Sequence, residues 1–240
     1  MSHRWRHTLT ERRMHIMLDF LHNSQSSPQR TARTAAPKAA VSSIPSPIAS
    51  GEDMRTVALH HSEISGSKLR EALNVPGGPA AVVGFVSPDG DFAAVARAVS
   101  TALPPNTKLV LLSTAGELCR EKDSGTYYCP AEENRQQIVL QIFSHRLMER
   151  THLMTIPLPD EDLRAGELRL STEDRIARLQ SEVNKQTIPF TVDFRDTFAL
   201  IYADGLSACE TFLLQALYRS KKLPCPYIGG SAGGKLDFQH

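Results

Sequence analysis

The sequence has no long apolar run and no large excess of charge of either sign. A bilayer-spanning helix needs about 20 consecutive, mostly apolar residues, and no such stretch occurs in the 240 residues. The 27 Lys and Arg residues nearly balance the 26 Asp and Glu residues, whereas a nucleic-acid-binding domain usually carries a clear basic excess. We therefore expect neither a membrane span nor a nucleic-acid partner.

Cysteine is scarce and widely spaced. The four cysteines are Cys119, Cys129, Cys209 and Cys225, and no Cys-x-x-Cys motif occurs. Structural zinc sites need closely spaced ligand pairs, so no zinc framework is expected. The first arginines are not followed by the apolar segment of a secretory signal. These absences predict reduced thiols and a cytoplasmic location.

The near-neutral charge is unevenly distributed along the chain. Residues 1–50 hold seven basic and two acidic residues, and residues 51–240 hold 20 basic and 24 acidic residues. Residues 24–50 are rich in Ser, Ala, Pro, Thr and Gln and contain no aromatic residue. They cannot bury enough apolar surface to offset the entropy lost on ordering. We predict a disordered basic extension over residues 1–53, in which residues 13–22 form at most a short amphipathic turn or two.

The sequence leaves three explanations of this extension open. It is a passive tail or the product of an upstream start codon, with the working chain beginning at Met14, Met17 or Met54. Alternatively it is an organelle transit peptide, because such peptides are rich in Arg and Ser and poor in acidic residues. The third explanation is a specific interaction arm.

Residues 54–240 are predicted to form one α/β domain. Strand-length apolar runs lie at 55–60, 80–86, 108–112, 136–143, 152–156 and 197–203. Helical periodicity lies at 66–74, 91–103, 172–184 and 207–219. This alternation is typical of a mostly parallel or mixed sheet flanked by helices.

Polar residues mark the expected starts of three of these helices. Asp91 is placed to cap the second helix. Ser171 with Asp174, and Ser207 with Glu210, have the spacing of capping boxes.

Three expected strands each run into a small, polar, glycine-containing turn. In open α/β sheets ligands bind beyond the carboxyl ends of strands, and free N–H groups and hydroxyls at such turns can hold an anion. We therefore predict that the three turns line one ligand cleft. The candidate ligand-binding residues are Ser113, Thr114, Gly116, Glu117, Asp204, Ser207, Gly229, Gly230, Ser231 and Gly233.

No familiar nucleotide-binding or nucleophile motif occurs at these turns. Residues 229–234 lack the Lys-Ser/Thr pair of a P-loop, and no G-x-G-x-x-G opens a helix. The surroundings of Ser231 match the G-x-S-x-G nucleophile elbow only in outline. Cys209 is expected at a helix start, where the dipole lowers a thiol pKa, although a small buried cysteine is the commoner explanation. An enzyme using Ser231 or Cys209 therefore remains an alternative.

Four segments occur in an order that resembles a known family. They are Val86-Ser87-Pro88-Asp89, Ser113-Thr114-Ala115-Gly116-Glu117, Asp204-Gly205-Leu206-Ser207 and Gly229-Gly230-Ser231-Ala232-Gly233. Residues 54–240 resemble the N-terminal module of FIST (F-box and intracellular signal transduction) domain proteins. Leu111-Leu112 stand where the family often has Gly-Cys, and Gly234 stands where it usually has Asp. The family normally continues through a C-terminal module, so the chain resembles half of the usual sensor.

The resemblance implies a cytoplasmic sensory input module, without catalysis, that binds a small ligand. It further implies a separate signalling partner, such as a histidine kinase, a diguanylate cyclase or a chemoreceptor module. Some members resemble haem-binding nitric-oxide sensors, for which His240 is the first candidate ligand here, followed by His60 and His145. A further alternative is a truncated, interaction-only module, in which an open sheet edge leads to a homo-oligomer.

Overall fold

The computed structural model describes residues 13–21, 53–118, 128–130 and 137–234. Two four-stranded sheets make up most of this part of the chain, with strand orders β10-β9-β1-β8 and β2-β7-β3-β4, and a small sheet pairs β5 with β6. The strands are β1 (Arg13–Leu21), β2 (Met54–His60), β3 (Pro79–Val86), β4 (Lys108–Ser113), β5 (Gly116–Leu118), β6 (Tyr128–Pro130), β7 (Gln137–Ser144), β8 (Met148–Pro157), β9 (Thr197–Asp204) and β10 (Tyr227–Ala232). The helices are η1 (His61–Glu63), α1 (Ser67–Leu73), α2 (Phe92–Ala102), α3 (Glu161–Arg164), α4 (Thr172–Lys185) and α5 (Glu210–Ser220).

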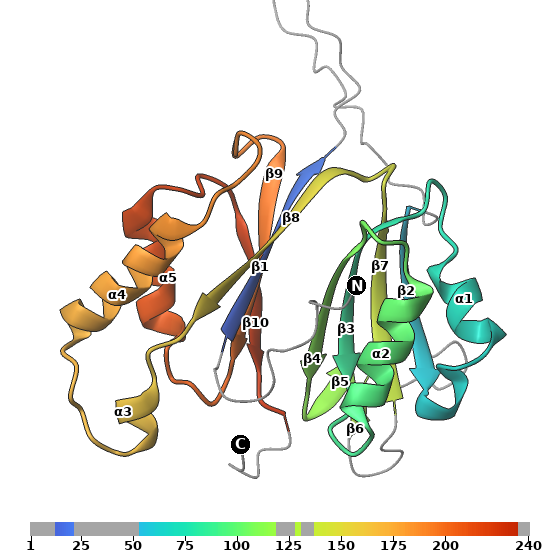
Figure 1. The fold of residues 1–240 in the computed structure, drawn as a ribbon, viewed down its shortest axis with the longest axis horizontal. Helices are drawn as coiled ribbons and strands as arrows, with labels where there is room; N and C mark the ends of the chain where they lie inside the picture. The colour runs from blue at the N-terminus through green and yellow to red at the C-terminus, as the bar shows by residue number, and fades with distance from the viewer. Residues whose placement is uncertain (1–12, 22–52, 119–127, 131–136, 235–240) are drawn as a thin grey trace, which may run out of the picture.

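The two large sheets face each other, and the helices lie on their outer sides (Figure 1). Buried side chains form three clusters, one in each of the three spaces between layers. The inner cluster includes Val83 from β3, Met148 from β8 and Leu200 from β9, so it joins the two sheets. The molecule therefore has four layers: helices, sheet, sheet and helices.

The sheets are mixed, as the sequence predicts. β3 and β4 are parallel and are joined through α2, and β9 and β10 are parallel and are joined through α5. β7 inserts antiparallel between β2 and β3. Parallel strands at the ends of these units bring their carboxyl ends to one edge of each sheet.

Local sequence explains several of these elements. Asp91 caps α2 by accepting the N–H of Ala94 (2.8 Å), and Ser171 caps α4 by accepting the N–H of Asp174 (3.1 Å). Both predicted caps are confirmed. In β3, Gly84 leaves the space that Leu111 and Leu140 of the neighbouring strands occupy, because a Cβ there would lie 2.3 and 2.8 Å from their methyl groups.

Residues 13–21 differ from the expected amphipathic turns. They form β1, which pairs antiparallel with both β8 and β9 and thus completes the first large sheet. In the sequence, Met14, Ile16, Leu18 and Phe20 recur with the period of two that is typical of a strand. A segment of nine residues matches both the helical period and the strand period in part. It is a strand here because its backbone pairs with β8 and β9. The division of the chain at residue 53 stays a prediction, since the rest of residues 1–52 lies outside the described residues.

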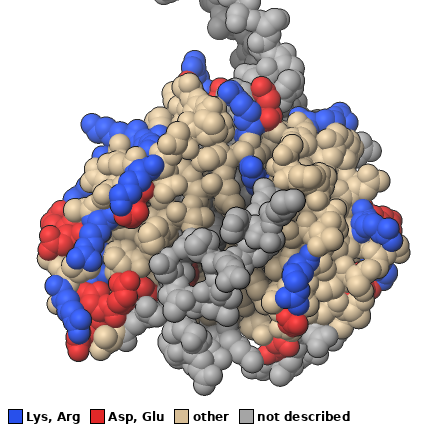
Figure 2. All heavy atoms as spheres, in the orientation of Figure 1, with Lys and Arg blue, Asp and Glu red and all other residues tan. Residues whose placement is uncertain are grey.

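Charged side chains of both signs lie side by side on the outer helical face in Figure 2. Within the described ranges, no helix is both long and apolar enough to cross a bilayer.

Candidate functional site

The three predicted turn segments meet at the lower end of the two sheets (Figure 1). The N–H of Gly205, just after β9, donates to the carbonyl of Ala232 at the end of β10 (2.9 Å). The N–H of Gly234 donates to the carbonyl of Ser113 at the end of β4 (3.1 Å). These two hydrogen bonds bring the ends of β4, β9 and β10 together, although the strands come from different sheets.

The glycine-rich segment is a strand and not a turn, which corrects the prediction for Gly229, Gly230 and Ser231. It forms β10 along β9, with Gly229 opposite Ile201 and Ser231 opposite Ala203. A Cβ on Gly229 would lie 1.7 Å from the carbonyl oxygen of Ile201. The approach of the two backbones therefore requires glycine at this position.

An apolar groove of about 220 Å³ runs between α5 and the strands β9 and β10. Gly229 and Gly230 contribute no side chains to its strand wall, and Leu213 and Leu214 come from the helix. The residues that line it are Ile201, Ala203, Glu210, Leu213, Leu214, Tyr227, Ile228, Gly229, Gly230 and Ser231. The groove therefore contains the predicted residues Gly229, Gly230 and Ser231.

The polar end of this groove is formed by Glu210 and Ser231. The hydroxyl of Ser231 donates a hydrogen bond to the Glu210 carboxylate (2.9 Å). At the other end, the Tyr227 hydroxyl donates to the carbonyl of Leu223 (2.7 Å). Burial raises the pKa of Tyr227 to about 12, with a smaller contribution from Cys225, so this phenol stays neutral. A ligand would thus meet one carboxylate, one hydroxyl and a largely apolar wall.

Asp204 and Ser207 hold the β9–α5 turn together. The Asp204 carboxylate accepts the N–H of Leu206 (2.8 Å), and the Ser207 hydroxyl donates to the carbonyl of Asp204 (2.7 Å). Ser207 is fully buried. Their observed contacts are those of a turn, and ligand binding by either residue stays a prediction.

The predicted capping box of Ser207 and Glu210 is wrong. Helix α5 begins at Glu210, with Cys209 at the N-cap position and no side-chain cap. Ser207 accepts the N–H of Cys209 (3.3 Å) and lies in the preceding turn. The turn is two residues longer than the pattern suggests, and Ala208 adopts a left-handed conformation with φ of 52°. The Glu210 carboxylate is thereby directed to Ser231 and not to the start of its own helix.

The segment 113–117 begins at the end of β4 in the other large sheet, and none of its residues lines the groove. Ser113 ends β4, and the N–H of Thr114 donates to the carbonyl of Val86 (3.1 Å). Gly116 and Glu117 belong to β5, which pairs with β6; the side chain of Glu117 lies outside what the structure describes. Of this segment, Ser113 lies next to the end of β10, and Gly233 directly follows that strand.

Cys209 does not have the environment of a nucleophile. Its side chain is fully buried, and burial raises the pKa of the thiol to about 11 despite nearby Arg175. This finding corrects the expected lowering by the helix dipole and agrees with the structural explanation. The pKa of the Cys225 thiol is also raised to about 11 by burial. Because the thiolate is the reactive form, neither cysteine is activated at neutral pH.

Haem needs an axial ligand beside an apolar pocket, and no histidine lines the 220 Å³ groove. His60 is exposed and accepts the N–H of Ser62 (3.3 Å), and His145 is also exposed. No group of three or more metal-ligating side chains occurs in the part of the chain that the structure describes. His240 lies outside that part, and its role as a haem ligand stays a prediction.

Several groove residues are absent from the sequence-based prediction. Ile201, Leu213, Leu214 and Tyr227 carry no motif, and the spacing of Glu210 from Ser207 predicts a helix cap and not a groove residue. The available signal was the strand–helix–strand order of residues 197–232, because such a unit packs one side of its helix against both strands.

The fold and groove define a layered α/β domain with an apolar recess between a helix and an edge strand. Comparison with protein-family models finds the FIST N domain over residues 80–240. The chain therefore belongs to the FIST family, a family of sensory domains in signal transduction. Neither the curated proteins nor the solved structures include a match to the chain. The matched region begins within β3 and includes the whole of the α5–β10 groove.

Proposed function

We propose that the chain is a cytoplasmic sensory input module that binds a small ligand in the groove between α5 and β10. The observation that carries this proposal is that the glycine-rich segment of the family resemblance forms one wall of the groove. The bound state is passed to a separate protein, for which a histidine kinase, a diguanylate cyclase or a chemoreceptor module are the candidates. Membership of a sensory family supports signalling without catalysis.

The groove favours a small ligand with an apolar part and a hydrogen-bond donor. Its volume of about 220 Å³ is below the roughly 300–1,000 Å³ typical of sites for drug-sized molecules. Glu210 is the charged group that lines it, and a carboxylate accepts hydrogen bonds and repels anions. An ammonium group beside Glu210 and Ser231, with an aliphatic part against Leu213, satisfies both features. Small amino acids and primary amines are therefore better candidates than simple acids.

Thermal unfolding of the purified chain tests this proposal. Small aliphatic amino acids, primary amines, the matching carboxylic acids without an amine, and haem are added separately. A ligand present at about 100 times its Kd is expected to raise Tm by roughly 5–10 °C, because it binds only the folded state. The acids without an amine are expected to have little effect.

Variants connect the effect to the groove. Glu210→Gln removes the charge and is expected to weaken binding by about tenfold. Glu182→Gln on α4 is the matched control and is expected to leave binding unchanged, since Glu182 pairs with Lys185 away from the groove. A panel without any stabilising compound, or equal affinity of both variants, would contradict the proposal.

The strand-end residues Ser113, Thr114, Asp204 and Ser207 remain candidates for a second part of the site. Ser113→Ala distinguishes a ligand in the groove from a ligand at the strand ends, because Ser113 does not line the groove. If the ligand occupies the groove alone, this variant retains full affinity.

A further inference from the structure

The outer edge of β10 is open among the described residues. β10 is the last strand in its sheet, next to β9. The carbonyls of Pro226 and Ala232 accept hydrogen bonds from β9 and the turn after it (2.9 Å each). Because backbone groups alternate along a strand, Tyr227, Gly229 and Ser231 direct theirs outward. Proline and charged residues usually protect an open edge from pairing with another strand. β10 contains neither.

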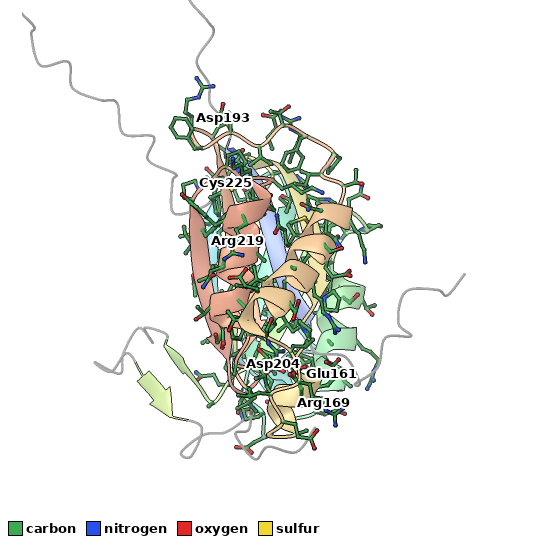
Figure 3. The ribbon with its side chains drawn as sticks, turned by 90° about the vertical axis from the view of Figure 1, so that its left-hand side faces the viewer. Glu161, Arg169, Asp193, Asp204, Arg219 and Cys225 are labelled. Carbon is green, nitrogen blue, oxygen red and sulfur yellow. The ribbon has the colours of Figure 1, made fainter. Side chains whose placement is uncertain are left out.

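The helix beside this edge exposes two large hydrophobic side chains, Leu214 and Tyr218. Thr211, Leu214, Gln215 and Tyr218 have the i, i+3, i+4, i+7 spacing of one helix face, and all four are exposed. Leu214 is 48% exposed and Tyr218 is 82% exposed, and Ile228 of β10 is 58% exposed. Figure 3 views this layer of the molecule, with Asp204 near the start of α5 and Arg219 near its end.

We propose that this surface binds a second copy of the chain, with the two β10 strands antiparallel around a twofold axis at Gly229. Such an interface is formed by the same surface on both copies. Each α5 covers β9 and β10 of its own copy. The two helices are then separated by about two strand spacings, or roughly 10 Å, which is close to the 8–10 Å at which helices pack. Leu214 and Tyr218 face the partner helix.

The surface is complementary to itself in shape. With the axis at Gly229, Ile228 of one copy lies opposite Gly230 of the other. Gly230 has no atom within 4 Å of the position of a Cβ, so it leaves open space for that isoleucine. Directly opposite side chains in a pair without mutual backbone hydrogen bonds are close neighbours, and Ile228 becomes buried.

The surface is also complementary to itself in charge. Glu210 lies beside Ser231, which the twofold axis places opposite Tyr227 of the other copy. The four-residue step from Ser231 to Tyr227 covers about 13 Å along the strand, and about nine residues cover the same length along a helix. Nine residues after Glu210 lies the last turn of α5. Glu210 of one copy therefore faces the last turn of α5 in the other copy. Lys221, the exposed C-cap residue of α5, directly follows that turn. Two Glu210–Lys221 attractions thus form in each dimer.

Light scattering after size-exclusion chromatography tests this arrangement with the full chain. The unmodified protein is expected to elute with the mass of two chains and to dissociate on dilution. Glu210→Lys and Lys221→Glu each place like charges together twice, and each is expected to weaken the dimer by about tenfold or more. An equimolar mixture of the two variants restores both attractions and is expected to recover the two-chain mass.

The control is Arg70→Glu, a charge reversal at an exposed position of α1 on the other sheet, which is expected to leave the dimer intact. Circular dichroism establishes that all variants are folded. A monomeric unmodified protein at every concentration overturns the proposal, and so does a mixture of folded variants that stays monomeric. A dimer that persists in Leu214→Asp overturns it as well. None of these measurements requires a ligand, so they are independent of the proposed sensory function.

Discussion

Gly229 and Gly230 are adjacent residues with opposite constraints. A Cβ on Gly229 would lie 1.7 Å from the carbonyl oxygen of Ile201, whereas a Cβ on Gly230 meets no atom within 4 Å. The first glycine is required by the approach of two backbones, and the second leaves space at the surface. In the Gly-Gly pair of the family resemblance, the first glycine therefore allows β10 to pack against β9, and the second leaves space at the open edge.

Alanine substitutions separate these two roles. Gly229→Ala forces β10 away from β9 and is expected to destabilise the chain by about 2 kcal/mol or more, which lowers Tm by at least roughly 4 °C. Gly230→Ala is the matched control, with Tm expected within about 2 °C of the unmodified protein. Thermal unfolding by circular dichroism measures both. Equal Tm values for the two variants would show that β10 does not lie against β9 as described.

At the scale of elements, a buried ion pair fixes α4 to the segment that follows β8. Arg175 of α4 donates to both carboxylate oxygens of Asp162 in α3 (2.8 and 2.7 Å) and to the carbonyl of Pro159. The side chains of Arg175 and Asp162 are only 1% and 6% exposed. The hydrogen bond from Arg175 and that from the N–H of Leu170 hold the pKa of Asp162 well below its ordinary value of 3.8. The pair is therefore charged in the folded chain.

This pKa predicts how stability depends on pH. The unfolded chain binds a proton at Asp162 near pH 3.8 while the folded chain does not, so stability falls as pH decreases below about 4. Asp162→Asn is expected to lower Tm at pH 6 and to reduce the further loss between pH 6 and pH 3. Glu161→Gln, on an exposed position of the same helix, serves as the control. If Asp162→Asn retains the pH dependence of the unmodified protein, the pair does not contribute to it.

At the scale of the whole molecule, the groove proposed to bind a ligand and the proposed dimer surface share α5 and β10. Leu214 and Ile228 line the groove and are also exposed at the edge. A second copy would cover the open side of the groove. Ligand binding and self-association would then be coupled, which is the property that a sensory input module needs to transmit a signal.

The coupling is reciprocal and can be measured from both sides. A ligand of the groove is expected to change the dissociation constant of the dimer, and dimerisation is expected to change the ligand Kd by the same factor. Sedimentation at several ligand concentrations gives the first quantity, and titration calorimetry above and below the dimer dissociation constant gives the second. Unequal factors, or no effect in either direction, would separate the two surfaces.

The sequence predicted the parts of the fold that depend on local chemistry. The apolar run at β3, the cap at Asp91 and the cap at Ser171 are each determined by residues within a few positions, and each is confirmed. The predicted start of α5 was wrong, because Ser207 hydrogen-bonds to the carbonyl of Asp204 and the N–H of Cys209 inside the preceding turn, and the helix begins only at Glu210. β1 was missed because a nine-residue segment is stabilised as a strand by β8 and β9, which come much later in the chain.

The candidate site shows the same division. The sequence by itself determined an α/β chain, which follows from composition and periodicity, and its resemblance to the family rests on four short segments that include Gly229 and Gly230. Only the tertiary structure shows that Glu210 lies beside Ser231, that the two glycines belong to an edge strand and not to a turn, and that Cys209 is buried. Those features depend on which elements pack together. Packing brings together residues that are far apart in the sequence, and no local sequence pattern predicts such contacts.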